Sequence, residues 1–482
     1  MRKIILVLLF ELLSTSVSAQ NVLKLDEYLQ KVGRDNPALK AINMSIDSSG
    51  NKILEMDMIY SPYLVGNYTW MDDKAGSGFG SSLNTSQMLI NSWTFNLNKR
   101  FQTGSNVSFG YTNTDTDITL ASPTTMFGPF PVSRFKAYDM KPYVKVEQSL
   151  LRDFMSRQTD ANINKTKSLV RAGQYMQYFS GQQIILKAHL VYMNLSLSRE
   201  ILNFRKEELA RSEEILKWSQ NRVDLDLADE GDLLQVEALH KLRQLTLQMA
   251  TEDEKNASRD YNELLGLSED NVTDQTQPLS EIIAACENTD KITYTGQRAD
   301  VLASKASYKS AEYAKTETLY RAYPEVSATG AMSLHGLDLS QADAFKQITG
   351  ADKPTYSIGL NLIVPLDVPT LRKVVKGYDV EYDASKENLT KAQLSAKKDW
   401  TKLSENWKNV KQRLALAKEI KEIQSLRLAN ERKKFERGRT TMFQLLSAEN
   451  DLDDSTINVY RLMFEMLSVD AQVDLYNTQE MK

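Results

Sequence analysis

The residue types most often used for catalysis and metal binding are few in this chain, and they are scattered. Histidines occur at His189, His240 and His335, and Cys286 is the only cysteine. A zinc site needs several such ligands at short, characteristic spacings, which these four residues lack. We interpret the histidines as surface or packed structural residues, and we expect no metal, no cofactor and no disulfide within the chain.

Motifs for nucleotide binding and hydrolysis are also missing. Residues 76–82, GSGFGSS, resemble a glycine-rich phosphate loop, but Ser81 stands where the third glycine should be. No strand-turn-helix pattern surrounds this segment, and the sequence contains no P-loop, HExxH or GxSxG motif. We therefore predict a flexible loop there, and a protein that is not an enzyme.

Aromatic side chains form the next recognisable pattern, because they alternate with polar residues in short segments. In residues 59–71, IYSPYLVGNYTWM, Pro62 ends a helical pattern and the apolar period falls to two. The segment 92–113 alternates in the same way around a turn at residues 103–104. Such strands are typical of membrane β-barrels, although half-buried strands of a soluble sandwich show the same local pattern. The predicted membrane-facing aromatics are Tyr68, Trp70, Trp93, Phe95, Phe109, Tyr111 and Tyr356.

Long helical segments must position these strands. Residues 153–220 contain no proline and predict one helix, which would be about 100 Å long at 1.5 Å per residue. Two shorter helices stacked end to end would match it in length. The apolar seam of this helix is formed by Leu186, Leu190, Met193, Leu197, Ile201 and Phe204. The other predicted helices cover residues 25–58, 231–267, 298–321, 371–434 and 442–478.

The sequence also repeats itself. Residues 36–64 align without a gap with residues 298–326, and both segments pass from helix to strand at the same proline. DLLQVEA at 232–238 resembles QLLSAEN at 444–450, each just after a turn. We interpret the chain as a tandem duplication of one long unit.

The predicted organisation follows from these segments. Residues 1–19 are a signal peptide and residues 268–297 link the two repeats. Repeat 1 covers residues 20–267, with a helix, strands at 60–150 that include the extra hairpin 92–113, and a long helical hairpin at 152–267. Repeat 2 covers residues 298–482, with a helix, strands at 323–366 and a long helical hairpin at 371–478.

The N-terminus and the composition indicate export to the cell envelope. The first twenty residues combine Arg2 and Lys3 with an apolar run and small residues before a cleavage site after Ala19. Glu11 within the apolar run leaves a short buried helix as the alternative. No later run of 18 apolar residues exists and the mean hydropathy is −0.42, which excludes an ordinary transmembrane helix. The net charge of −4 and the lack of a basic stretch argue against nucleic acid as a partner.

The strands of one chain are too few to close a barrel alone. Lipid tolerates no open sheet edge, and single-chain barrels start near eight strands, whereas this chain offers about four to six. Several chains must therefore share one barrel. Three copies of about four strands give twelve, and three copies of about six give eighteen.

Over essentially the whole mature chain, the sequence resembles the TolC-like outer-membrane efflux protein family. The resemblance is carried by LKLDEYLQKVGRDNPALKA at 23–41, QSLLRDF at 148–154, GLNLIVPL at 359–366, and the turn motifs at 223–238 and 435–450. It implies a mainly α fold with a β-barrel segment. A long antiparallel α-helical barrel would be continuous with a twelve-stranded membrane β-barrel, built from two tandem repeats per chain and closed by homotrimerisation.

The resemblance also implies a function. The protein would be the outer-membrane channel, or exit duct, of a tripartite efflux or type I secretion system. It would passively conduct small molecules or exported polypeptides from an inner-membrane pump of resistance-nodulation-division or ATP-binding-cassette type, through a periplasmic adaptor (membrane fusion) protein. Its place would be the outer membrane of a Gram-negative cell, with the helical barrel in the periplasm. The alternative is an envelope structural or adhesive coiled-coil protein without transport activity.

Two features need the structure for their interpretation. The hairpin at 92–113 departs from the family, and the sequence leaves open whether it joins the barrel or caps its outer mouth. The turns at 222–232 and 434–441 end the long helices, so the resemblance places adaptor docking and the gate there. Their opposite charges would clamp the closed end, unless the acids form a solvated turn and Gly438 only caps a helix. The candidate tip residues are Asp226, Leu227, Asp229, Asp232, Arg437, Gly438, Arg439 and Thr440.

Overall fold

The structure is a computed structural model, and it describes most of the chain. The described residues are 22–75, 84–125, 129–226, 229–272, 274–286, 298–351 and 354–476. The predicted signal peptide, the glycine-rich loop at 76–82 and Leu227 lie outside them. The chain forms two compact units, one of residues 47–174 and 303–391, and one of the remaining residues.

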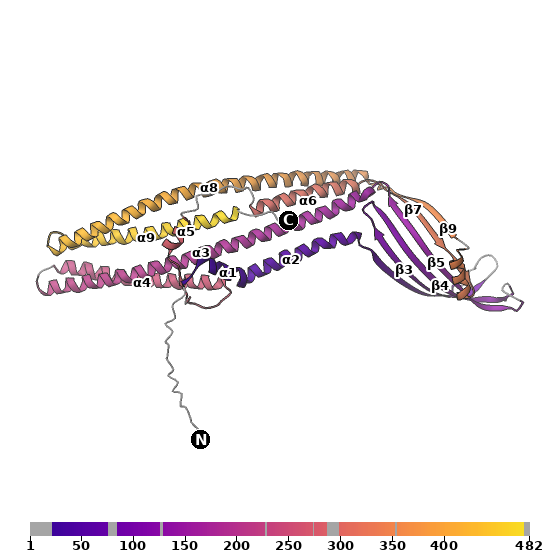
Figure 1. The fold of residues 1–482 in the computed structure, drawn as a ribbon, viewed down its shortest axis with the longest axis horizontal. Helices are drawn as coiled ribbons and strands as arrows, with labels where there is room; N and C mark the ends of the chain where they lie inside the picture. The colour runs from indigo at the N-terminus through magenta and orange to yellow at the C-terminus, as the bar shows by residue number, and fades with distance from the viewer. Residues whose placement is uncertain are drawn as a thin grey trace, which may run out of the picture. The chain divides into compact units, whose positions relative to one another are not determined.

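An antiparallel sheet follows the helix ends in the unit of residues 47–174 and 303–391 (Figure 1). Its hydrogen-bonded path runs β2-β3-β4-β5-β7-β9, and the short strand β8 pairs with β5 beside this path. This path has six strands in one chain, whereas a trimer with a twelve-stranded barrel needs only four strands from each chain. The strands are β2 (Tyr63–Asp73), β3 (Thr85–Arg100), β4 (Ser105–Thr124), β5 (Val132–Ser149), β7 (Glu325–Leu334), β8 (Gly336–Asp338) and β9 (Pro354–Ile363).

The hairpin predicted at residues 92–113 is the pair β3 and β4, and it lies within the sheet between β2 and β5. β3 has 16 residues and β4 has 20. The turn between them contains Gly104 at φ +80°, where a Cβ would collide with the carbonyl oxygen of Asp153. Glycine is required there because it reaches positive φ without steric cost and leaves room for the neighbouring backbone.

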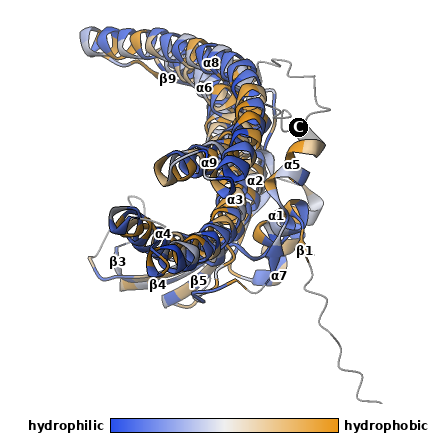
Figure 2. Cartoon of the chain, turned by 90° about the vertical axis from the view of Figure 1, so that its left-hand side faces the viewer, coloured by the Kyte–Doolittle hydropathy of each residue, from blue (hydrophilic) through white to orange (hydrophobic). Residues whose placement is uncertain are grey.

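Helices make up most of the rest of the described chain. The two long helices, α3 with 68 residues and α8 with 69, lie within a few residues of the predicted bounds. Figure 2 shows hydrophilic and hydrophobic residues alternating along α4, α6 and α8. None of the described helices is long and apolar enough to cross a membrane. The helices are α1 (Leu25–Asp35), α2 (Pro37–Asp57), α3 (Arg157–Asp224), α4 (Glu230–Leu264), α5 (Leu279–Cys286), α6 (Ala299–Arg321), α7 (Gln341–Gly350), α8 (Val368–Glu436) and α9 (Met442–Val473).

The single helix predicted at residues 25–58 is wrong, because the chain breaks at Asn36. The Asn36 side chain accepts a hydrogen bond from the Leu39 amide at 3.0 Å and donates one to the Leu264 carbonyl at 2.8 Å. Pro37 then opens α2, at the helix position where a missing N–H costs nothing. The apolar periodicity continues across this break, so periodicity alone could not locate it.

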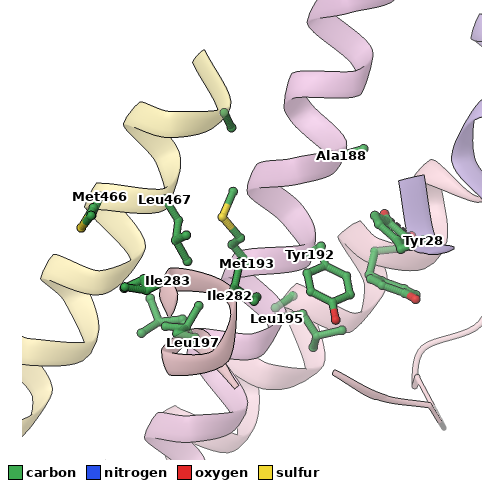
Figure 3. Close-up of a cluster of buried hydrophobic side chains, with 14 of the residues drawn as sticks. Tyr28, Ala188, Tyr192, Met193, Leu195, Leu197, Ile282, Ile283, Met466 and Leu467 are labelled. Carbon is green, nitrogen blue, oxygen red and sulfur yellow. Dashed lines mark hydrogen bonds between the residues drawn. The ribbon is translucent and has the colours of Figure 1, made fainter. Parts of the chain in front are cut away.

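The core of the unit that contains residues 175–302 gathers around the middle of α3 (Figure 3). Tyr28 of α1, Tyr192 of α3 and Tyr261 of α4 pack their rings together, with the Tyr28 and Tyr261 centroids 4.2 Å apart. The segment after α4 wraps back onto α3. There, β6 (Gln275–Thr276) pairs in parallel with β1 (Val22–Leu23). Of the predicted seam, Met193 and Leu197 are buried in this core.

The Tyr192 hydroxyl ties this wrapped segment to α3, which generates a prediction. It donates to the Leu23 carbonyl at 2.5 Å and accepts from the Gln277 amide at 2.9 Å, in a fully buried position. Tyr192→Phe removes both bonds and should lower the free energy of unfolding by about 1–3 kcal/mol. Thermal unfolding followed by circular dichroism measures this change.

Tyr460→Phe is the matched control for that variant. Tyr460 packs edge-on against Phe204, and its hydroxyl makes no hydrogen bond within the described part of the chain. It should therefore unfold at the wild-type temperature. Equal unfolding temperatures for the two variants would contradict the anchoring role of Tyr192.

Candidate functional site

The sheet has one apolar face and one polar face, and the strand register fixes their membership. Residues paired across an antiparallel ladder lie on the same face. The pairs Tyr68 with Trp93, Phe95 with Tyr111, and Phe109 with Val144 therefore share a face. The apolar face continues onto β7 and β9, where Val144 pairs with Met332 and Met332 pairs with Tyr356. All seven predicted aromatics, Tyr68, Trp70, Trp93, Phe95, Phe109, Tyr111 and Tyr356, lie on this apolar face.

The opposite face is polar and internally hydrogen-bonded. The Thr94 and Thr112 hydroxyls share a hydrogen bond of 3.0 Å between β3 and β4. The Tyr143 hydroxyl of β5 donates to the Asn96 side chain of β3 at 2.5 Å, passing over Gly110 of β4. This face is suited to contact with water, whereas the apolar face is suited to contact with lipid.

The two edge strands are open. Within the described sheet, β2 pairs only with β3 and β9 pairs only with β7. Every residue of β9 is exposed, and the Ile358 side chain is 94% exposed. An exposed edge presents unpaired backbone N–H and C=O groups and is a template for another strand.

A charged cleft lies on the polar face where the strands meet the helices. It has a volume of about 660 Å³ and is bordered by ion pairs between neighbouring segments. Arg152, just before α3, pairs with Glu325 of β7 at 3.2 Å, and Lys165 of α3 pairs with Glu317 of α6 at 3.0 Å. These pairs give the cleft a polar, water-compatible wall.

The tip of the α3–α4 hairpin is acidic and exposed. Asp229 caps α4 by accepting a hydrogen bond from the Gly231 amide at 3.0 Å, and Asp226 has a positive φ of 53°. Asp226 and Asp229 are exposed and Asp232 is half-buried. The capping bond shows that Asp229 has a local structural role, as in an ordinary helix start.

The tip of the α8–α9 hairpin is basic, and Gly438 ends α8 in a Schellman motif. The Gly438 amide donates to the Phe435 carbonyl at 2.9 Å and the Arg439 amide to the Lys434 carbonyl at 2.8 Å. Gly438 has φ +69°, and a Cβ added to it would meet no neighbour within 4 Å. Its C-cap role is therefore structural. Of the candidate residues in this tip, Arg437, Gly438 and Arg439 are exposed and Thr440 is half-buried.

The opposite charges of the two tips are not brought together within one chain. No ion pair in the described residues joins the acidic tip to Arg437 or Arg439. The two hairpins meet instead through an apolar cluster, in which Trp218 and Phe435 have ring centroids 4.8 Å apart. Arg222 lies over the Trp218 ring at 4.8 Å. Any clamp between opposite tip charges must therefore form between copies of the chain.

A buried ionic network that the sequence analysis missed joins α3, α4 and α9. The Arg243 side chain contacts Asp453 at 2.6 Å and Glu208 at 3.6 Å, and all three side chains are buried. Arg211 pairs with Asp453 at 3.1 Å and Arg205 pairs with Glu208 at 2.6 Å. Breaking a buried pair leaves an uncompensated charge, so this network fixes how the two hairpins pack.

A signal for this network was present in the sequence. Glu208 lies four residues after Phe204 and so continues the apolar seam of α3. A carboxylate at a seam position predicts a buried partner, because an unpaired buried charge is costly. The identity of the partners, Arg243 on α4 and Asp453 on α9, follows only from how the helices pack.

Burial raises the pKa of Asp453 to about 7, and the neighbouring Glu208 carboxylate adds to this shift. The positive charges of Arg243 and Arg211 act in the opposite direction. The site therefore holds a carboxyl group that titrates near neutral pH at the centre of the hairpin contact.

Groups suited to a metal ion are not assembled in the described part of the chain. No three His, Cys, Asp or Glu side chains there are grouped so that they could hold one. The chemistry that the arrangement supports is the separation of lipid from water by the sheet, and charge-dependent packing of the helical hairpins.

Comparisons with known proteins agree with this geometry. Residues 295–476 match the family model described as outer membrane efflux protein. No curated protein sequence matches the chain. The predicted resemblance to the TolC-like outer-membrane efflux proteins is confirmed, and the match supports an outer-membrane efflux channel.

Solved structures share the fold over nearly the whole chain. The outer-membrane channel OprN has a TM-score of 0.64 and 13% identity, over 94% of this chain and 89% of that one. The outer membrane protein VceC from Vibrio cholerae has a TM-score of 0.65 and 12% identity, over 94% and 95%. The MtrE outer membrane channel from Neisseria gonorrhoeae has a TM-score of 0.62 and 14% identity, over 96% and 92%.

The titration of Asp453 generates a pH prediction. Between its ordinary pKa of 3.8 and about 7, the folded protein keeps a proton that the unfolded chain has released. The stability from this group is present below about pH 4 and is lost as the pH rises to about 7. Asp453→Asn should remove this dependence of the stability on pH. The fall in unfolding temperature between about pH 5 and about pH 8 should therefore be smaller than in the wild type.

Asp451→Asn serves as the control. Asp451 lies on an exposed part of the same helix and pairs with Arg427 at 2.5 Å. Its variant should keep the wild-type pH dependence of the unfolding temperature. An unchanged pH slope in Asp453→Asn would exclude the buried network as its origin.

Proposed function

We propose that this member of the outer membrane efflux protein family is an outer-membrane channel, the exit duct of a tripartite efflux or type I secretion system. It would passively conduct small molecules or exported polypeptides that an inner-membrane pump delivers. A pump of resistance-nodulation-division or ATP-binding-cassette type would supply the energy.

One observation carries the proposal: a six-strand path with one apolar face, one polar face and two open edges. An apolar outer face and a polar inner face are what a water-filled membrane barrel requires. Because lipid tolerates no open edge, closure requires further strands from other copies of the chain. We propose a homotrimer, in the outer membrane of a Gram-negative cell, with its helices in the periplasm.

The helical tips are proposed as the end that meets the periplasmic adaptor and forms the gate. The acidic tip of α3–α4 and the basic tip of α8–α9 are exposed, and their charges are unpaired with each other inside the described part of one chain. In a ring of copies, the acidic tip of one chain would face the basic tip of the next. Each exposed pair contributes only about 0–1 kcal/mol, but a ring repeats the contribution and biases a closed state.

Conductance in planar lipid bilayers tests the channel. The purified protein should form discrete ion-conducting pores, whereas an envelope structural or adhesive protein should give none. Arg439→Glu should raise the resting conductance, because it replaces attraction between neighbouring tips by repulsion. Lys411→Glu changes an exposed charge in the middle of α8 by the same amount and should leave the conductance unchanged. If the resting conductance of Arg439→Glu equals that of the wild type, the basic tip is not part of the gate.

Gly438 tests adaptor docking separately from pore formation. A Cβ there meets no neighbour, so substitution acts only through the positive φ. Gly438→Val should distort the tip and make host cells sensitive to a large antibiotic, while bilayer conductance persists. Gly438→Asn should retain export, because asparagine tolerates left-handed backbone angles. Equal export by the two variants would show that the tip conformation is not needed for docking.

A further inference from the structure

We propose that each chain contributes six strands to the membrane wall, so that three copies close an eighteen-stranded barrel. Closure would occur through an antiparallel seam between β9 of one copy and β2 of the next. The proposal rests on the trimeric channel proposed above, and it changes the barrel from the twelve strands that the family resemblance implies.

The first argument is the position of the hairpin β3–β4 within the sheet. Strand β3 of the hairpin pairs with β2 along one side, and this ladder extends from the pair of Tyr63 and Asn98 to the pair of Asp73 and Met88. Strand β4 pairs with β5 along the other side. A hairpin that capped the barrel mouth would have to give up both ladders, and each unmade backbone hydrogen bond is costly in a dry environment.

The second argument is that the hairpin continues both faces of the sheet. Trp93, Phe95 and Phe109 carry the apolar face from β2 towards β5. On the polar face, a Cβ at Gly110 would overlap the side chains of Asn96 and Tyr143. Glycine at this position is what allows Tyr143 of β5 to reach Asn96 of β3. The hairpin is therefore shaped as a part of the wall.

The third argument is that the hairpin is anchored where the sheet meets the helices. The Met155 amide donates to the Thr103 carbonyl at 3.2 Å, and the Ser156 hydroxyl donates to the Phe101 carbonyl at 3.2 Å. The Arg100 guanidinium pairs with Asp153 and donates to Thr159 at 2.8 Å. The turn thus sits at the level at which the other strands join their helices.

The fourth argument concerns the direction of the edge strands. β2 leads away from α2 and β9 leads into α8, so the two edges run in opposite directions. Copies placed side by side therefore pair β9 with β2 in the antiparallel sense, and every seam is identical. Six strands from one chain fall below the smallest membrane barrels, whereas eighteen lie within their range. Barrel width grows roughly in proportion to strand number, so the lumen would be about half again as wide as with twelve.

Cysteine crosslinking tests the seam. If the strand ends nearest the helices are level, Thr69 of β2 lies opposite Ser357 of β9, both on the polar face. In a Cys286→Ser background, Thr69→Cys with Ser357→Cys should give disulfide-linked trimers on oxidation. Thr69→Cys with Ala331→Cys should give none, because Ala331 pairs with Ser357 from the interior strand β7 and lies one strand further away.

The seam register is inferred, so neighbouring positions are tested as well. Thr355→Cys and Gly359→Cys share the polar face of β9 with Ser357. Each is combined in turn with Thr69→Cys in the same background. Absence of linkage to all three β9 positions would overturn the seam.

Cysteine labelling in liposomes tests whether the hairpin lies in the wall. Thr94→Cys should react with a water-soluble maleimide about tenfold faster than Phe95→Cys, as Ala331→Cys should react faster than Met332→Cys on β7. Equal, fast labelling at positions 94 and 95 beside a clear difference on β7 would overturn the eighteen-stranded barrel while leaving the channel intact. Protein that neither conducts nor forms trimers would instead contradict the proposed function.

Discussion

The pairing of backbone hydrogen-bonding groups is the constraint on which this structure depends most. Each strand of the six-strand path pairs with neighbours on both sides except β2 and β9, whose outer edges are open within the described sheet. Lipid against the apolar face would exclude water as a hydrogen-bonding partner for these edges. A second copy of the chain would supply strands of the right direction and the right two-faced pattern. The proposed quaternary structure therefore rests on the secondary structure of a single chain.

The helical hairpins are held by a different kind of interaction. Apolar contacts such as that between Trp218 and Phe435 join the hairpins near their tips. Further along, the buried network of Glu208, Arg243 and Asp453 replaces apolar packing by charge. Apolar surfaces slide at little cost, whereas a buried ion pair has one favourable geometry and a large penalty when it separates. The network therefore fixes the register of the helices.

The sequence predicted the elements better than it predicted their contacts. Period-two and helical patterns located the long helices and all seven aromatics that share one sheet face, because both signals are local. The break at Asn36 was missed because apolar spacing continues across it. The buried network was missed because partners on α3, α4 and α9 are distant in sequence, and only the charge of Glu208 in the seam indicated it. The opposite charges of the two tips are evident in the sequence, but no ion pair within the described part of the chain joins them, and their pairing between copies stays a prediction.

The position of β3 and β4 also explains how a barrel can grow without losing its closure. Adding one strand would reverse the direction of every later strand, and it would move α3, α6 and α8 to the other end of the sheet. Adding a hairpin preserves both the antiparallel edges and the attachment of α2, α3, α6 and α8 at one end of the sheet. It requires only a tight turn where the strands meet the helices, and Gly104 supplies it. Two strands are therefore the smallest change that widens such a sheet and leaves its helices in place.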